Sequence, residues 1–229
     1  MPPQIEAERQ SARGDFLPAL RWAALTPLFD AVVRITTRER AFKRRLVDLA
    51  GVAPGEAVLD LGSGTGTLAI WLKQRQAEAD VVGLDADAQI LARARRKAAQ
   101  AGCDVKFAEG LSTALPFDDD AFDVVVSTLF FHHLTPAAKR GTLAEVRRVL
   151  KPSGRLLVAD YGAPGNPLMA AQLLWIRVFD GFEVTRENAR GLLPVLFREA
   201  GLARAEVRDE LSTPLGTLAI YSALAPLAG

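Results

Sequence analysis

The chain has 229 residues, of which 49% are hydrophobic and 24% charged, and its formal net charge is +1. This length and composition suit one globular domain with a sizeable core, and the balanced charge excludes an overall field that would draw the protein to nucleic acid. The single Cys103 excludes an internal disulfide and a cysteine-held metal site, so we expect no metal and a reducing, cytoplasmic location.

Residues 1–50 are expected to form a helical extension, or lid, before a main domain at 51–229. Apolar residues recur at roughly helical spacing from Phe16 to Ala50. The same region carries a basic cluster that fits a solvated helix face. A second interpretation is steering of an anionic acceptor, or peripheral contact with lipid headgroups. The cluster consists of Arg34, Arg38, Arg40, Lys43, Arg44 and Arg45.

From Ala57 onward, short apolar strands alternate with helical patterns. The strands are expected at 57–61, 80–85, 104–108, 122–127 and 154–160, and the helices at about 66–77, 87–101 and 136–150, with a short one near 112–115. This order predicts an α/β fold with a Rossmann-like, doubly wound sheet covered by helices on both faces. The first strand should lie where the strand order reverses, which is where such sheets bind ligands.

The last part of the chain departs from this alternation. Two helical segments and two strand-like runs are expected at about 167–180, 187–200, 204–211 and 215–224. Because Pro214 and Gly216 separate the two runs, we expect an antiparallel hairpin that closes a mostly parallel, seven-stranded sheet. The segment 163–185 is rich in large apolar residues and is expected to be an inserted lid helix.

The run VLDLGSGTG (58–66) joins the first strand to the helix that follows. Its glycines allow the backbone to turn tightly and approach a ligand, and the start of the helix offers N–H groups and partial positive charge. We therefore expect a ligand to be bound by Asp60, Gly62, Ser63, Gly64 and Gly66.

Asp85 ends the second strand, 19 residues beyond Gly66. A carboxylate at this place can accept hydrogen bonds from both hydroxyls of a ribose. The competing interpretation is an N-cap for helix 87–101, but Asp87 is the better candidate for that cap.

Four segments in this order resemble the class I S-adenosylmethionine-dependent methyltransferases, and most closely the ubiquinone/menaquinone-biosynthesis C-methyltransferase branch. They are VLDLGSGTG (58–66), VVGLDAD (81–87), ALPFDDDAFDVVVSTLFFHHL (114–134) and EVRRVLKPSGRLLVAD (145–160). The resemblance covers about 40–224 and implies S-adenosyl-L-methionine as cofactor and in-line methyl transfer as the reaction.

The resemblance also implies roles for single residues. The turn from Asp60 to Gly66 would hold the methionine end of the cofactor, Asp85 would bind its ribose, and Ala86 would lie against its adenine. Ser127, at the end of the fourth strand, would lie near the transferable methyl group.

One position departs from the family pattern. The family commonly has Gly-Asp before a Leu-Pro-Phe segment, whereas this chain has Gly110-Leu111, and a leucine side chain cannot accept a hydrogen bond from adenine. We expect Glu109, or backbone groups near Leu111 and Ser112, to take that place. The departure keeps open a second interpretation, a catalytically weak binding or scaffold protein.

His132 and His133 follow the fourth strand and are the candidate catalytic residues. A histidine there could remove a proton from a phenol, an amine or an activated carbon, and the competing interpretation is packing within the loop. A metal role is disfavoured because no third ligand lies near in the sequence.

The expected partner is a small acceptor that is apolar, aromatic or lipid-like, because the lid segment 163–185 is apolar. The same apolar groups also fit packing on the sheet, or on a second subunit in a homodimer. No nucleic-acid partner is expected, because Ser127-Thr128-Leu129-Phe130 stands where base-amine enzymes have an Asn/Asp-Pro-Pro-Tyr motif. An NAD-dependent oxidoreductase is a further alternative, which the G-x-G-x-G spacing and the hairpin argue against.

Overall fold

The computed structural model describes residues 39–227, so the expectations for most of the N-terminal extension, including Arg34 and Arg38, lie outside the described residues. The strands are β1 (Ala57–Leu61), β2 (Asp80–Asp85), β3 (Lys106–Glu109), β4 (Phe122–Thr128), β5 (Leu150–Tyr161), β6 (Ala203–Thr213) and β7 (Gly216–Leu224). The helices are α3 (Glu39–Ala50), α4 (Thr67–Arg75), α5 (Ala88–Gln100), the 3-10 helix η1 (Phe131–His133), α6 (Pro136–Val149), α7 (Pro167–Asp180), α8 (Arg186–Ala189) and α9 (Leu193–Glu199).

The strands form one seven-stranded sheet in the order β3-β2-β1-β4-β5-β7-β6. Strands β1 to β5 pair in parallel, and β7 pairs antiparallel with both β5 and β6. The mostly parallel sheet and its C-terminal hairpin are therefore confirmed. Strand β1 lies between β2 and β4, so the strand order reverses there, as expected.

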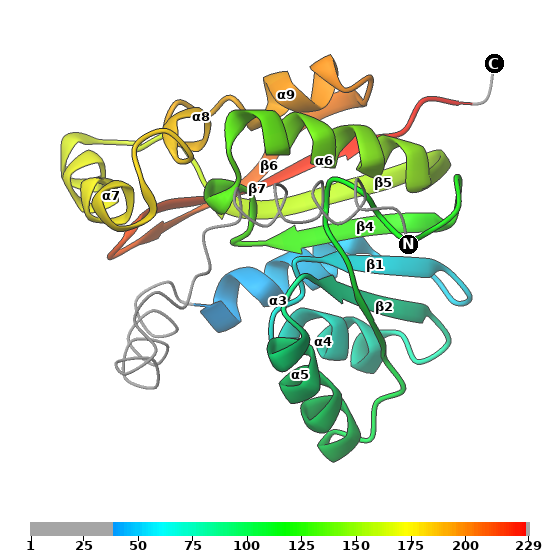
Figure 1. The fold of residues 1–229 in the computed structure, drawn as a ribbon. Coiled ribbons are helices and arrows are strands. Elements are labelled where there is room, and N and C mark those ends of the chain that lie inside the picture. The colour runs from blue at the N-terminus through cyan, green and yellow to red at the C-terminus, as the bar shows by residue number, and fades with distance from the viewer. Residues whose placement is uncertain (1–38, 228–229) are drawn as a thin grey trace, which may run out of the picture.

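Helices cover both faces of the sheet (Figure 1). The helices α3 and α4 pack on one face with Leu173 of α7, and α6 and α9 pack on the other. Neighbouring residues of β1 point to opposite faces, because side chains alternate along a strand. Val58 joins the apolar cluster under α3 and α4, whereas Leu59 joins the one under α6, and both are fully buried.

Helix α3 is the only part of the N-terminal extension that the structure describes. Its Phe42 and Leu46 are buried against the sheet, and Arg45 forms an ion pair with Asp209 of β6 at 2.7 Å. Within the basic cluster, Arg40 and Arg44 are exposed, which fits the solvated helix face.

Two expectations about helices were wrong. The segment 112–115 is a turn between Leu111 and Ala114, which form an isolated bridge, and Pro116 directly after it cannot continue a helix. The segment 187–200 is two helices, α8 and α9, because Gly191 has a φ of 66° that breaks the helical path.

Among residues 39–227, no helix is both long and apolar enough to cross a membrane. In the same part of the chain, no group of three or more metal-ligating side chains is found.

Candidate functional site

The carboxyl ends of β1, β2, β3 and β4 meet at one edge of the sheet. The strand register pairs Leu61 with Leu84 and with Ser127, and pairs Asp85 with Glu109. Residues from four separate parts of the sequence thus follow one another along this edge, where an open α/β sheet binds its ligand.

The glycine turn between β1 and α4 depends on the left-handed backbone region. Gly62, Gly64 and Gly66 have φ values of 70°, 52° and 72°, which a residue with a Cβ adopts only with strain. A Cβ at Gly62 would lie 2.5 Å from the ring of Phe130, and one at Gly66 would lie 2.7 Å from the ring of Phe107. At Gly64, by contrast, a Cβ would meet nothing within 4 Å, so the turn is open at its middle glycine.

Two buried polar atoms beside this turn have no partner among the described residues. Asp60 is 1% exposed; its Oδ2 accepts a hydrogen bond from the backbone N–H of Ala69, whereas its Oδ1 accepts none. The hydroxyl of Ser63 is likewise buried without a partner. Burial raises the pKa of Asp60 to about 7, and the charge of Lys43 opposes this rise.

Asp85 holds the turn and the start of α5 together. Its Oδ2 accepts from the N–H of Gly64 at 2.9 Å, and its Oδ1 accepts from the N–H of Asp87 at 3.1 Å. Asp87 itself caps α5 by accepting from the N–H groups of Gln89 and Ile90. The cap role therefore belongs to Asp87, and the partly exposed carboxylate of Asp85 remains at the edge of the sheet.

The residues present fit the cofactor that the resemblance implies. The ammonium group of its methionine end is a donor that suits the unpartnered Oδ1 of Asp60, and its carboxylate suits the N-terminus of α4. The ribose hydroxyls suit the two acceptor oxygens of Asp85. Gly64, where a Cβ would meet nothing within 4 Å, follows Asp60 in the sequence and donates its N–H to Asp85.

The adenine side of the site differs from what the family pattern would give. Leu111 forms the small bridge with Ala114, and the Ser112 hydroxyl hydrogen-bonds to the Thr142 hydroxyl of α6 at 2.8 Å. Ser112 is thus bound to α6 through its side chain. Glu109 is exposed at the end of β3, and Ala86 is partly buried beside Asp85.

Ser127 lies where the sequence places it, at the end of β4, but its hydroxyl faces inward. It is fully buried and donates to the carbonyl of Leu61 in β1 at 2.8 Å. Its side chain therefore links β1 to β4. The side chain that contacts the glycine turn belongs to Phe130, three residues later, whose ring lies against Gly62.

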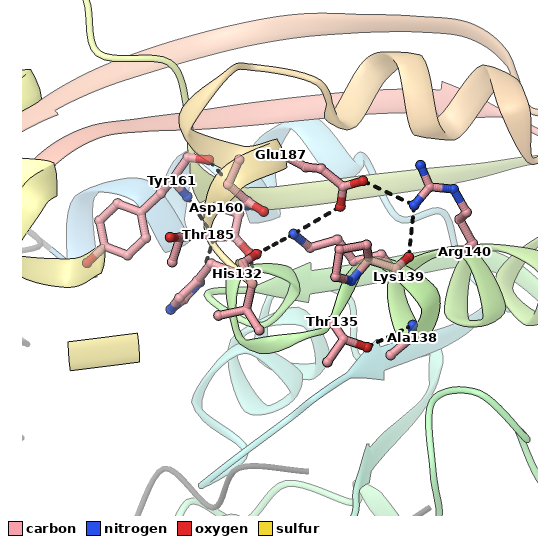
Figure 2. A network of polar contacts seen from close by, with 12 residues as sticks. His132, Thr135, Ala138, Lys139, Arg140, Asp160, Tyr161, Thr185 and Glu187 are labelled. Carbon is pink, nitrogen blue, oxygen red and sulfur yellow. Dashed lines mark hydrogen bonds and ion pairs between the residues drawn. The ribbon is translucent and has the colours of Figure 1, made fainter. Parts of the chain in front are cut away.

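The two histidines lie in η1, directly after β4. His132 is 4% exposed, and its Nδ1 lies 2.7 Å from Oδ1 of Asp160, near the end of β5 (Figure 2). The rings of His132 and His133 lie 3.9 Å apart between centroids. Burial, with a smaller contribution from His132, lowers the pKa of His133 to about 3, so His133 is neutral.

A second buried ionic group fixes α8 beside these histidines. Lys139 of α6 is fully buried, donates to the carbonyl of Val184 at 2.6 Å and lies 3.4 Å from Glu187 of α8 (Figure 2). Arg140 donates to the other oxygen of Glu187 at 3.1 Å. Burial lowers the pKa of Lys139, whereas the charge of Glu187 opposes this.

The residues that the sequence reasoning missed are Asp160, Lys139 and Glu187. Asp160 carried a usable signal, because it follows the apolar run Leu156-Leu157-Val158-Ala159 just as Asp60 and Asp85 follow theirs. Lys139 and Glu187 carried none, since charged residues in a helix are solvated in most proteins.

Comparison with known proteins agrees with this geometry. Residues 58–154 match a family described as a methyltransferase domain. The chain is 40% identical over 145 residues to a demethylmenaquinone methyltransferase of Thermus thermophilus, covering 62% of this chain and 65% of that protein. It is 36% identical over 157 residues to the ubiquinone/menaquinone biosynthesis C-methyltransferase UbiE of a Marinomonas species, covering 67% and 59%. The chain thus spans less than two thirds of the length of these relatives.

The fold is also that of a solved S-adenosylmethionine-dependent methyltransferase from Methanosarcina mazei, with a TM-score of 0.63 at 22% identity, over 77% of this chain and 95% of that one. The sheet edge, the glycine turn, the aspartate at the end of β2 and the match to a methyltransferase domain all indicate the same kind of site. The chain contains a class I S-adenosylmethionine-dependent methyltransferase domain, similar to that of the ubiquinone/menaquinone C-methyltransferases.

Proposed function

We propose that the protein transfers a methyl group from S-adenosylmethionine to a small acceptor that is apolar and carries an aromatic ring. The observation that carries this proposal is the row of acceptors at one sheet edge, with the unpartnered Oδ1 of Asp60 beside the glycine turn and Asp85 one strand away. In this proposal residues 51–229 form the catalytic domain and residues 1–50 its lid.

The cofactor supplies a methyl group already activated by a sulfonium, so the protein mainly binds, orients and excludes water. The glycine turn would hold the methionine end of the cofactor and Asp85 its ribose, which would fix the direction from which an acceptor must approach. Holding two reacting groups in line contributes about 7–11 kcal/mol toward lowering the barrier. Phe130, packed against Gly62, keeps an apolar wall beside that approach.

The acceptor class is inferred from the apolar surface of α7 and from the names of the relatives. Leu173 of α7 packs on the sheet, whereas other large apolar side chains in and beside α7 are exposed. These are Leu168, Leu174, Trp175, Val178 and Phe182. The relatives are named for demethylmenaquinone and ubiquinone/menaquinone biosynthesis, and the reduced, quinol form of such a compound would be an apolar, aromatic acceptor of this kind.

Calorimetry with purified protein and S-adenosylmethionine tests the donor site. Asp85→Ala should weaken the affinity tenfold or more, because the ribose hydroxyls lose both of their acceptor oxygens. The matched control is Asp87→Ala, which removes the cap of α5 and about 1 kcal/mol of stability but no ribose acceptor. Equal affinities for wild type and Asp85→Ala would remove Asp85 from the donor site.

Radiolabelled methyl transfer to a short-chain demethylmenaquinol, kept reduced, tests the acceptor. The reduced form is the appropriate probe because a sulfonium methyl is an electrophile and needs an electron-rich ring. Tight cofactor binding without transfer to any aromatic acceptor would instead favour the scaffold interpretation.

A further inference from the structure

Asp160 of β5 binds the backbone of the turn that follows β4. Its Oδ2 accepts from the N–H groups of Phe130 and His132, at 3.2 and 3.3 Å. Its Oδ1 accepts from the N–H of Tyr161 and lies 2.7 Å from Nδ1 of His132 (Figure 2). The side chain is fully buried, so these bonds take the place of water around its oxygens. One carboxylate of β5 thus fixes two backbone positions in the neighbouring segment.

The turn that Asp160 binds is strained. It begins at Leu129, whose φ of 50° is a left-handed conformation that leucine rarely adopts. The N–H of Leu129 donates to the carbonyl of Ala159 at 2.9 Å, one residue before Asp160. A strained backbone persists only where the surrounding structure fixes it, and here the bonds to Ala159 and Asp160 do so. Loss of the bonds to Asp160 would therefore let the turn relax.

This turn carries Phe130, whose ring lies against the first glycine of the glycine turn. A Cβ on Gly62 would be 2.5 Å from the ring, so the ring has room only because that residue is glycine. Phe130 is partly buried, whereas the next residue, Phe131, is fully buried and packs against Phe197 with an edge-on geometry. Phe131 therefore belongs to the core, and Phe130 keeps accessible surface beside the candidate donor site.

The turn needs an acceptor on both sides of the side chain at position 160. Burial alone would raise the pKa of Asp160, but the charge and hydrogen bond of His132 hold it below its usual value, so both oxygens accept. An asparagine of the same shape has one acceptor oxygen. It could satisfy the two N–H groups that face Oδ2 or the two nitrogens that face Oδ1, but not all four.

We infer that Phe130 contacts the methionine end of the cofactor, and that Asp160 is the residue that positions it by fixing the backbone of the turn. The inference rests on the proposed methyl transfer, in which the glycine turn holds that end of the cofactor. Asp160 is fully buried, so its influence on the donor site passes through the turn and the ring of Phe130.

Amide hydrogen exchange followed by NMR tests the turn without any cofactor. In the wild type the N–H groups of Phe130 and His132 should be protected from exchange. In Asp160→Asn they should exchange about tenfold faster or more, because a buried hydrogen bond is lost or weakened, while the amides inside β4 change little. Wild-type amides at these two positions that exchange as fast as those of an exposed loop would overturn the inference, even if Asp160→Asn does not fold.

Calorimetry with S-adenosylmethionine tests the contact with the ring. Phe130→Ala should weaken the affinity about tenfold, because the cofactor loses the apolar surface of one aromatic side chain. Phe131→Leu is the matched control, since it removes apolar packing from the core and not from the edge of the sheet. It should lower stability and leave the affinity within about twofold. Equal affinities for wild type and Phe130→Ala would contradict the inference.

A double-mutant cycle separates positioning from a general loss of stability. Asp160→Asn should weaken cofactor affinity in the wild-type background but have little further effect in Phe130→Ala, because its influence passes through the ring. Asn188→Ala is the matched control for position 160. It removes another buried hydrogen bond to the same strand end, from Asn188 to the carbonyl of Tyr161, and should leave the affinity unchanged.

The outcomes distinguish this inference from the function on which it rests. A wild type that binds no S-adenosylmethionine contradicts the proposed function. A wild type that binds it, combined with equal effects of Asp160→Asn in the presence and absence of the Phe130 ring, contradicts only the positioning by Asp160.

Discussion

Asp60 and Asp160 show how two aspartates at strand ends acquire opposite properties. Both are almost completely buried. Asp60 accepts one backbone hydrogen bond at 3.1 Å and has one unpartnered oxygen, so desolvation dominates and its pKa rises to about 7. Asp160 accepts from His132 and from three backbone N–H groups. The charge of His132, followed by the hydrogen bonds from His132 and from the N–H of Tyr161, holds the pKa of Asp160 below its usual value. The charge of His132 and the hydrogen-bond partners, and not a difference in burial, separate the pKa values of the two carboxyls.

The raised pKa of Asp60 makes stability depend on pH. Between about pH 4 and 7 the folded protein binds a proton at Asp60 that the unfolded chain has released, so stability falls as pH rises. Asp60→Asn removes this dependence. Between pH 4 and pH 8, wild type should therefore lose on the order of 4 kcal/mol of unfolding free energy that the Asp60→Asn variant does not lose.

Urea unfolding at several pH values measures this difference. Asp160→Asn is the opposite case, because the pKa of Asp160 is lowered: its stabilising effect is present above about pH 4 and is lost as pH falls further. A difference for Asp60→Asn that stays constant with pH would contradict the raised pKa.

At the scale of elements, the segment after β5 is fastened at two places. Leu173 of α7 is buried against the sheet, and α8 is held by Lys139 through Val184 and Glu187. Other large apolar side chains of α7 are exposed to solvent. The sequence reasoning left open whether these residues face an acceptor, the sheet or a second subunit. Within α7, Leu173 packs on the sheet, whereas Leu168, Leu174, Trp175 and Val178 are exposed.

Glu187→Gln tests the attachment of α8. It leaves the buried charge of Lys139 uncompensated, so we expect a loss of about 3–5 kcal/mol in the free energy of unfolding. Glu199→Gln is the matched control, since Glu199 also pairs with Arg140, at 3.7 Å, but is half exposed. It should change stability by no more than about 0.5 kcal/mol. Equal losses in chemical denaturation would show that burial of Lys139 is not what makes Glu187 important.

At the scale of the whole molecule, the cofactor should stabilise the fold because its candidate site joins β1, β2 and β4. At a concentration 100 times its dissociation constant, S-adenosylmethionine should add about 2.7 kcal/mol, which raises the melting temperature by roughly 5–10 °C for a chain of this size. NAD at the same concentration should give no comparable shift. A larger shift with NAD in differential scanning fluorimetry would favour the oxidoreductase alternative.

The sequence alone determined the sheet, its reversal at β1, the closing hairpin and the identity of the glycine turn. These features depend on local chemistry: alternation of apolar runs, residues able to adopt positive φ, and acids at strand ends. The cap at Asp87 was predictable for the same reason, because a capping oxygen and its N–H partners lie within three residues.

Only the tertiary structure decided how the remaining groups pair. His132 meets Asp160 across 28 positions, and Lys139 meets Val184 across 45. The hydroxyl of Ser127 meets the carbonyl of Leu61 across 66 positions, and the hydroxyl of Ser112 meets that of Thr142 across 30. No periodicity records such contacts, because they follow from strand order and helix packing. The sequence thus predicted the residues of the candidate methyl-donor site and the two histidines, whereas the pairing of His132 with Asp160 emerged only when β4 and β5 came to lie side by side.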